Sequence, residues 1–204
     1  MNHRFHDRDW VENYAETITT RRPERVEAFA HIVKQVQALE SDSPTVIELA
    51  AGPGLLASAL LDGVDGLQYV GVDYSPAMVH FAENKMADYK ARCQFLCVDL
   101  RKENWAEGLP TQVDAIVSNM ALHDLDELKF VEAVYQKSAE LLKPGGLFLN
   151  AELVVKPESE EDVDGGKAKV GWHLEVLNGL GFEKIECPLD FGHYACIQGH
   201  CGKG

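Results

Sequence analysis

A short turn, with an acidic residue before it and two glycines within it, is the part of this sequence best suited to holding a ligand. Glu48 is followed by Ala50, Gly52 and Gly54, between an apolar stretch and a helix-forming stretch. Glycine lets the backbone turn sharply and approach a ligand closely, and a helix N-terminus points unpaired N–H groups at such a turn. The spacing predicts a strand, a tight turn and a helix that bind a small ligand at the C-terminal end of the strand.

Two kinds of ligand fit this turn. The run Gly52-Pro53-Gly54-Leu55-Leu56-Ala57 matches the G-x-G-x-x-A dinucleotide fingerprint, in which an acid such as Asp73 follows about 20 residues later. An NAD-dependent oxidoreductase is therefore one hypothesis. Glu48 argues against it, because a carboxylate at the end of the strand would repel a bound pyrophosphate. The same carboxylate suits a ligand that carries an ammonium or sulfonium group.

Composition argues against several classes of partner. The net charge of −14 argues against DNA or RNA, whose binding relies on Lys and Arg to neutralise phosphates. No apolar run approaches the roughly 20 residues that span a bilayer, so no membrane partner is predicted. The N-terminus lacks an apolar signal core, and the five cysteines form no Cys-x-x-Cys pair. Together these features predict a cytoplasmic protein with reduced thiols.

The elements that must position the turn alternate between strand and helix signals. Residues 10–38 are predicted to be helical, and 41–44 form a linker turn. Predicted strands then cover Thr45–Ala50, Gln68–Asp73, Cys93–Val98, Val113–Ser118 and Leu147–Val155, and predicted helices cover Gly54–Leu61, Pro76–Tyr89 and Leu125–Leu142. This alternation predicts a parallel sheet with helices on both faces.

The pattern changes after the fifth strand. Residues 156–166 are acidic and predict a mobile surface loop, and 170–180 predict a helix. Two further strands, 182–188 and 191–199, are separated by only two residues. So short a link cannot hold a crossover helix, so this last pair should be antiparallel. An antiparallel final hairpin is not the usual layout of a dinucleotide-binding sheet.

With these residues and elements placed, the chain resembles the class I S-adenosylmethionine-dependent methyltransferases from about residue 38 to residue 199. Their first motif, acid-x-Gly-x-Gly-x-Gly, is similar to Glu48–Gly54, with Ala50 in place of the first glycine. The later motifs resemble, in order, Val70–Ser75, Leu96–Leu100, Val113–His123 and Leu141–Gly146. The resemblance implies an α/β fold with a Rossmann-like, seven-stranded, mostly parallel sheet, helices on both faces and an antiparallel last strand. We expect an N-terminal helical cap over 1–40 and the cofactor-binding domain over 41–204, within a single domain overall.

The resemblance implies a set of cofactor contacts. Asp73 would accept hydrogen bonds from the ribose hydroxyls, and Asp99 would bind the adenine amino group beside the backbone N–H of Leu100. The full set implied for S-adenosylmethionine is Glu48, Ala50, Gly52, Gly54, Asp73, Tyr74, Met78, Asp99, Leu100, Asn119 and Met120. Simpler interpretations remain for some of them, because Asp73 and Asp99 could be turn residues and Met78 and Leu100 could be core residues.

His123 is the candidate catalytic residue. It follows the fourth predicted strand. In the family that the chain resembles, acceptor and methyl donor meet at this place. An imidazole with a pKa near 6.5 could take a proton from a hydroxyl, amine or thiol acceptor. The alternative is a surface histidine before a helix cap, since Asp124 and Glu127 have the spacing of a capping box. Methyl transfer by direct displacement needs no metal, and none is predicted. His193 and Cys196 should point to opposite faces of the last strand.

The acceptor is predicted to be a small molecule. In the family that the chain resembles, the acceptor pocket is covered by an N-terminal helical segment and by the stretch after the fifth strand. Both of these segments are short in this chain. Besides His123, the residues expected beside the acceptor are Trp10, Tyr14, Trp172 and His173, although each aromatic could instead anchor a helix face. A non-catalytic S-adenosylmethionine-binding protein of the same fold is the second alternative. The acceptor's identity and the oligomeric state stay open.

Overall fold

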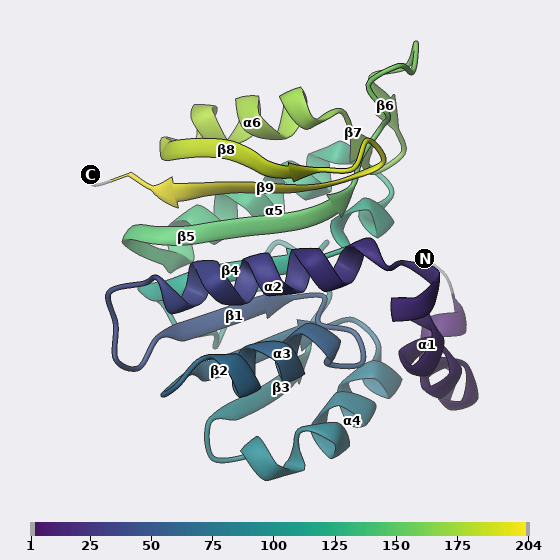
Figure 1. The fold of residues 1–204 in the computed structure, drawn as a ribbon, viewed down its shortest axis with the longest axis vertical. Helices are drawn as coiled ribbons and strands as arrows, with labels where there is room; N and C mark the ends of the chain where they lie inside the picture. The colour runs from purple at the N-terminus through teal and green to yellow at the C-terminus, as the bar shows by residue number, and fades with distance from the viewer. Residues whose placement is uncertain (1–2, 203–204) are drawn as a thin grey trace. The chain divides into compact units, whose positions relative to one another are not determined.

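The computed structural model describes residues 3–202, which divide after Asp99 into two compact units. The first unit ends at Asp99 and the second begins at Leu100. Each unit combines strands with covering helices (Figure 1). Among residues 3–202, no helix is both long and apolar enough to cross a membrane.

The first unit contains three parallel strands in the order β3-β2-β1. Its elements are η1 (His3–His6), α1 (Arg8–Arg21), α2 (Glu24–Gln37), β1 (Thr45–Leu49), α3 (Leu55–Gly63), β2 (Gln68–Asp73), α4 (Pro76–Lys85), η2 (Ala87–Tyr89) and β3 (Cys93–Cys97). Parallel pairing brings the ends of β1 and β2 level, with Leu49 opposite Val72. The glycine turn and Asp73 therefore leave the sheet at the same edge.

The second unit contains four strands in the order β4-β5-β9-β8. Its elements are β4 (Val113–Asn119), η3 (Leu122–Leu125), α5 (Leu128–Leu141), β5 (Leu142–Leu153), β6 (Val163–Asp164), β7 (Lys167–Ala168), α6 (Val170–Gly179), β8 (Phe182–Asp190) and β9 (Tyr194–Cys201). β4 and β5 are parallel, whereas β9 is antiparallel to both β5 and β8. Figure 1 shows β5, β9 and β8 side by side, with α6 next to β8.

The predicted fold class is confirmed. The larger sheet has seven strands, is mostly parallel and ends in the antiparallel pair β8–β9. Amphipathic spacing explains how helices attach within a unit, because Ala28, Ile32 and Val36 of α2 recur four residues apart and are all buried. In the second unit every residue of β4 is buried, as expected for a parallel strand covered on both faces.

Three local predictions were wrong in detail. The helix predicted over residues 10–38 is two helices, because Arg22 leaves the helical conformation, with a φ of −135°, before Pro23, the N-cap residue of α2. The loop predicted over 156–166 ends in a small hairpin made by β6 and β7. β5 begins at Leu142, so the Lys-Pro-Gly-Gly run at 143–146 lies inside the strand instead of before it.

Candidate functional site

The glycine turn has the geometry predicted for a ligand-binding loop. Ala50, Gly52 and Gly54 all have positive φ, at 50°, 56° and 74°, so the chain passes through left-handed conformations between β1 and α3. A Cβ at Gly52 would meet no atom within 4 Å. The backbone of the turn therefore borders open space, as a turn that approaches a ligand requires.

Asp73 joins the glycine turn to the end of β2. Its Oδ2 accepts a hydrogen bond from Gly52 N at 2.8 Å, and its Oδ1 accepts one from Ser75 N at 2.8 Å. Burial raises the pKa of Asp73, although these two backbone hydrogen bonds and His6 oppose the rise. Each carboxyl oxygen has a second lone pair, so Asp73 can accept ribose hydroxyls while it holds the turn.

Glu48 is buried at the end of β1, and its carboxyl group faces another part of the same unit. Tyr69 OH donates to Glu48 Oε2 at 2.5 Å. Burial raises the pKa of Glu48 to about 8, against the opposing effects of Tyr69 and Arg25. A carboxyl group with this pKa is mostly protonated at pH 7. A protonated Glu48 would not repel a pyrophosphate, so in this structure Glu48 does not by itself exclude a dinucleotide.

The remaining predicted contacts of the first unit lie around the same strand ends. Met78 is buried near the start of α4, whose N-cap Ser75 accepts a hydrogen bond from Met78 N at 3.2 Å. Tyr74 is exposed, and its ring lies 5.2 Å from that of His6. Asp99 is half-buried two residues after β3. In the second unit, Leu100 is buried.

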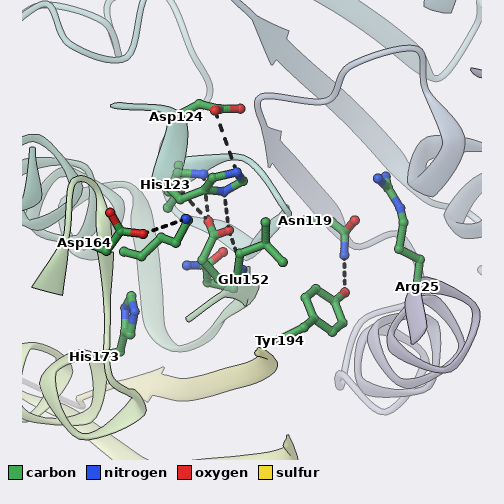
Figure 2. Close-up of polar contacts among 12 residues, drawn as sticks. Arg25, Asn119, His123, Asp124, Glu152, Asp164, His173 and Tyr194 are labelled. Atoms are coloured by element: carbon green, nitrogen blue, oxygen red, sulfur yellow. Dashed lines mark hydrogen bonds and ion pairs between the residues drawn. The ribbon is translucent and has the colours of Figure 1, made fainter. Parts of the chain in front are cut away.

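His123, a largely buried residue with 14% of its side chain exposed, pairs with the buried Glu152 in the second unit. Its Nδ1 lies 2.7 Å from Glu152 Oε1, and the backbone N–H groups of Leu122 and His123 donate to Oε2 at 2.7 and 3.2 Å. Leu153 N also donates to Oε1 at 2.7 Å. Glu152 thus fixes both the ring and the backbone of His123. Figure 2 shows the ring between Glu152 and Asp124.

The charges of this pair favour ionised partners. Burial lowers the pKa of His123, but the charge of Glu152 and the hydrogen bond to it outweigh burial, so the pKa lies above its ordinary value. Burial raises the pKa of Glu152, but the charge of His123, the hydrogen bond from its ring and that from Leu153 N hold it below its ordinary value. The imidazole is therefore a stronger base than a free histidine.

The capping-box prediction for Asp124 was wrong. Asp124 lies within η3, and Glu127 is the N-cap residue of α5 without a side-chain capping bond. The short helix η3 intervenes before α5 and ends at Asp126, which adopts a left-handed φ of 68°. Asp124 Oδ1 instead lies 3.7 Å from His123 Nε2. The imidazole consequently has an acidic side chain near each of its nitrogens.

Asn119 and Met120 lie at the end of β4. Asn119 Nδ2 donates to Tyr194 OH at 2.5 Å, while the buried Oδ1 of Asn119 has no hydrogen-bond partner (Figure 2). Met120 has a left-handed φ of 50°. The free acceptor on Asn119 is consistent with a ligand that donates a hydrogen bond there.

The four residues predicted to lie beside the acceptor, besides His123, differ in their location and contacts. Trp10 and Tyr14 stack at 4.9 Å on α1. His173 is fully buried, and its Nδ1 lies 2.8 Å from Tyr135 OH. Trp172 packs near the same tyrosine, with ring centroids 6.4 Å apart. Contact of these four side chains with an acceptor stays a prediction.

Sequence analysis missed Glu152 and Tyr194. Glu152 was detectable as the one charged residue in the mostly apolar end of β5, since buried carboxylates are seldom found without a partner. Tyr194 carries no such signal, because tyrosine is common in strands. Among the residues the structure describes, no group of three His, Cys, Asp or Glu side chains could hold a metal ion.

Comparison with known proteins adds a family and a fold. The model of a methyltransferase domain family matches residues 47–148. The chain is 32% identical over 111 residues to a hybrid PKS-NRPS synthetase, apdA, from Emericella nidulans, which covers 53% of this chain and 3% of that protein. It is 30% identical over 115 residues to an uncharacterized methyltransferase from Schizosaccharomyces pombe, covering 54% of this chain and 39% of that protein. The chain therefore spans well under half the length of these relatives.

Solved structures share the fold across nearly the whole chain. An O-methyltransferase family protein from Burkholderia thailandensis has a TM-score of 0.75 at 21% identity, covering 98% of this chain and 62% of that one. PigF, solved with SAH, has a TM-score of 0.74 at 18% identity, covering 96% of this chain and 60% of that one. At such identities the similarity establishes the fold.

Proposed function

Because the chain belongs to the methyltransferase domain family, we propose that it transfers the methyl group of S-adenosylmethionine to a small-molecule acceptor, with His123 as the general base. The observation that carries the role of His123 is its buried pair with Glu152, in which Nδ1 and Oε1 are 2.7 Å apart. A carboxylate on one nitrogen orients the ring and leaves the other nitrogen for proton transfer.

The first unit offers the groups that would hold the cofactor. When bound, S-adenosylmethionine supplies a methyl group activated by a sulfonium. The open space beside Gly52 admits a ligand against the turn, and Asp73 keeps lone pairs for the ribose hydroxyls while it anchors Gly52 N. The SAH in PigF, which shares the fold, supports the same cofactor class.

Glu48 would respond to the cofactor's charge. Its pKa of about 8 applies to a carboxyl group buried with a neutral tyrosine. A cation close to a carboxyl group lowers its pKa, so an ammonium group beside Glu48 would favour the ionised form. The protein would then provide a negative charge when the cationic ligand is present.

The second unit offers the groups that would act on the acceptor. In the neutral imidazole, Nδ1–H of His123 would donate to Glu152, and Nε2 would be free to accept the acceptor's proton. Glu152 stabilises the imidazolium that results, and Asp124 lies 3.7 Å from Nε2. This arrangement suits acceptors that must lose a proton to become nucleophiles, such as hydroxyl groups.

Binding separates this proposal from the oxidoreductase hypothesis. We expect calorimetric titration to show binding of S-adenosylhomocysteine and no binding of NADH. Tight binding of NADH with no response to S-adenosylhomocysteine would reject the cofactor assignment.

Turnover tests the base and distinguishes an enzyme from a non-catalytic binding protein. We would follow methyl transfer from S-adenosylmethionine across a panel of small hydroxyl, amine and thiol acceptors. For an acceptor that reacts, His123→Asn should lower kcat/KM about a hundredfold. His80→Asn, at an exposed histidine of α4, is the matched control and should leave it unchanged. Equal rates in the two variants would remove His123 from the mechanism, and no turnover with any acceptor would favour the binding protein.

A further inference from the structure

We propose that the β6–β7 hairpin, residues Val163–Ala168, is a latch that positions His123, with Gly166 as its point of contact and Lys167 as its charged group. The functional meaning of this latch hairpin rests on the role proposed above for His123. Its structural content can be tested without an acceptor.

The latch hairpin is anchored to the strand that carries Glu152. Val163 pairs with Ala168 and Asp164 pairs with Lys167, so Gly165 and Gly166 form a two-residue turn. Val155 N donates to Ala168 O at 3.0 Å, just beyond the end of β5. Lys169 N donates to Asp162 O at 3.1 Å, and Lys169 Nζ donates to Ser159 O at 2.9 Å. These bonds hold the base of the hairpin against the unit.

Gly166 brings the turn against the backbone of His123. A Cβ at position 166 would lie 2.3 Å from His123 O and 3.1 Å from His123 Cα. Gly165 provides the left-handed conformation of the turn, with φ of 61°, whereas Gly166 has no positive φ. The backbone conformation at 166 thus allows a side chain, and the carbonyl of His123 excludes one. The glycine is needed there for close approach.

Lys167 adds a positive charge to the acidic surroundings of His123. The charged groups that act on the ring come from three elements: Glu152 on β5, Asp124 on η3 and Lys167 on β7. Lys167 Nζ pairs with Asp164 Oδ2 at 3.0 Å across the hairpin (Figure 2). Asp126 acts on Asp124, and His173 acts on Glu152. The effect of Lys167 on the pKa of His123 is opposite to that of both carboxylates.

These contacts give the latch hairpin two effects on one residue. Through Gly166 it limits where the His123 backbone can lie, and through Lys167 it limits how basic the ring becomes. Displacement of about 1 Å can lower a catalytic rate a hundredfold, so a seated hairpin keeps the base in its working position. Gly166 and Lys167 are positioning residues for His123.

The first experiment adds one methyl group. In Gly166→Ala the new Cβ must displace either the hairpin or His123. The backbone N–H groups of Leu122 and His123, which donate to Glu152, should then exchange with solvent about tenfold faster. Gly171→Ala is the matched control, because a Cβ there meets nothing within 4 Å, and its exchange should equal that of the unmodified protein. Unchanged exchange of both amides in a folded Gly166→Ala protein would overturn the proposal.

The second experiment removes the charge and does not depend on the fate of the first variant. In Lys167→Gln the pKa of His123, followed by NMR of the imidazole, should move to a higher value. Lys137→Gln is the matched control, since Lys137 also pairs with an acid three residues away, Glu140, on the surface of α5. The same His123 titration in all three proteins would reject the role of Lys167.

Failure of the latch and failure of the proposed function give different results. S-adenosylhomocysteine binding and acceptor turnover test the function, while amide exchange and the His123 titration test the latch. If the latch holds, an acceptor that reacts should also show its rise of kcat/KM with pH displaced to higher pH in Lys167→Gln. A displacement to lower pH would contradict the proposed sign of the effect of Lys167.

Discussion

Glu48 and Glu152 are both buried, with 3% and 1% of their surface exposed, and each lies in a different unit. Glu48 accepts one hydrogen bond, from the hydroxyl of Tyr69. Glu152 accepts hydrogen bonds from the His123 ring and from the backbone N–H groups of Leu122, His123 and Leu153. The pKa of Glu48 is raised to about 8, and that of Glu152 is lowered. Equal burial thus gives opposite protonation states.

The difference shows what a buried carboxyl group needs in order to stay ionised. Desolvation disfavours the charged form in both places, and at Glu48 the neutral hydroxyl of Tyr69 and the charge of Arg25 together do not compensate for it. An imidazolium with several N–H donors does compensate. We therefore assign to the first unit a carboxyl group that is neutral until a cation arrives, and to the second a permanent charge.

The largest effect should follow from removing the charge of Glu152. Glu152→Gln keeps the size of the side chain but removes the buried anion that pairs with His123 and accepts hydrogen bonds from the backbone N–H groups of Leu122, His123 and Leu153. Breaking a buried ion pair costs about 3–5 kcal/mol, so we expect a loss of this size in the free energy of unfolding at pH 6, measured by urea denaturation. A loss below about 1 kcal/mol would mean that the pair contributes no more than an exposed one.

Glu48→Gln, in contrast to Glu152→Gln, should make the protein more stable relative to the unmodified protein as pH rises. In the unfolded chain Glu48 titrates near 4.5, and in the folded protein near 8. Between these values the folded state retains a proton that the unfolded state has released, so the stability due to Glu48 falls as pH rises. The free energy of unfolding should fall by about 1.4 kcal/mol per pH unit from this group. The variant Glu48→Gln has no carboxyl group at this position and should not show that fall.

The comparison of Glu48→Gln with the unmodified protein is made by urea denaturation. Relative to the unmodified protein, the variant should gain about 3 kcal/mol between pH 5 and pH 7. If both proteins have the same pH dependence over this range, Glu48 is ionised in the folded state and the contrast with Glu152 disappears.

Asp73 tests an intermediate case, since it has two backbone N–H donors and a raised pKa. Asp73→Ala removes the anchor of Gly52 and the proposed ribose acceptor. We expect the Kd for S-adenosylhomocysteine to rise at least tenfold, about 1.4 kcal/mol, by calorimetry. Asp88→Ala, at an exposed acid of η2, should leave the Kd unchanged. Unaltered affinity in Asp73→Ala would show that the ribose contact is misassigned.

The smallest effect should come from Ala50, where the first glycine of the motif is missing. Ala50 has φ of 50°, a conformation that disfavours residues with a Cβ. Ala50→Gly should therefore raise the free energy of unfolding by about 0.5–1 kcal/mol, measured by thermal denaturation with calorimetry. A destabilised variant would show that the Ala50 methyl group packs usefully in the turn.

The sequence was a good guide where signals are local and periodic. The glycines and Asp73 could be placed at one sheet edge, because parallel strands bring their ends together. Glu48 was placed correctly at a strand end, but its protonation state depends on Tyr69, twenty-one residues away in the chain. Glu152 was missed because its partner, His123, lies on another element. The capping-box prediction failed at Asp124 because this residue lies within the short helix η3, which ends at the left-handed Asp126 before α5 begins.

The proton on Glu48 also connects ligand binding to the solvent. A cation that binds beside this group expels the proton into the buffer, so the measured heat of binding includes the ionisation heat of that buffer. The apparent affinity for such a ligand should then increase with pH up to about 8, where Glu48 is already half ionised. For a neutral ligand at the same place, neither the heat of binding should depend on the buffer nor the affinity on pH. Titrations in buffers with different ionisation heats would therefore show whether the ligand bound in the first unit carries a positive charge.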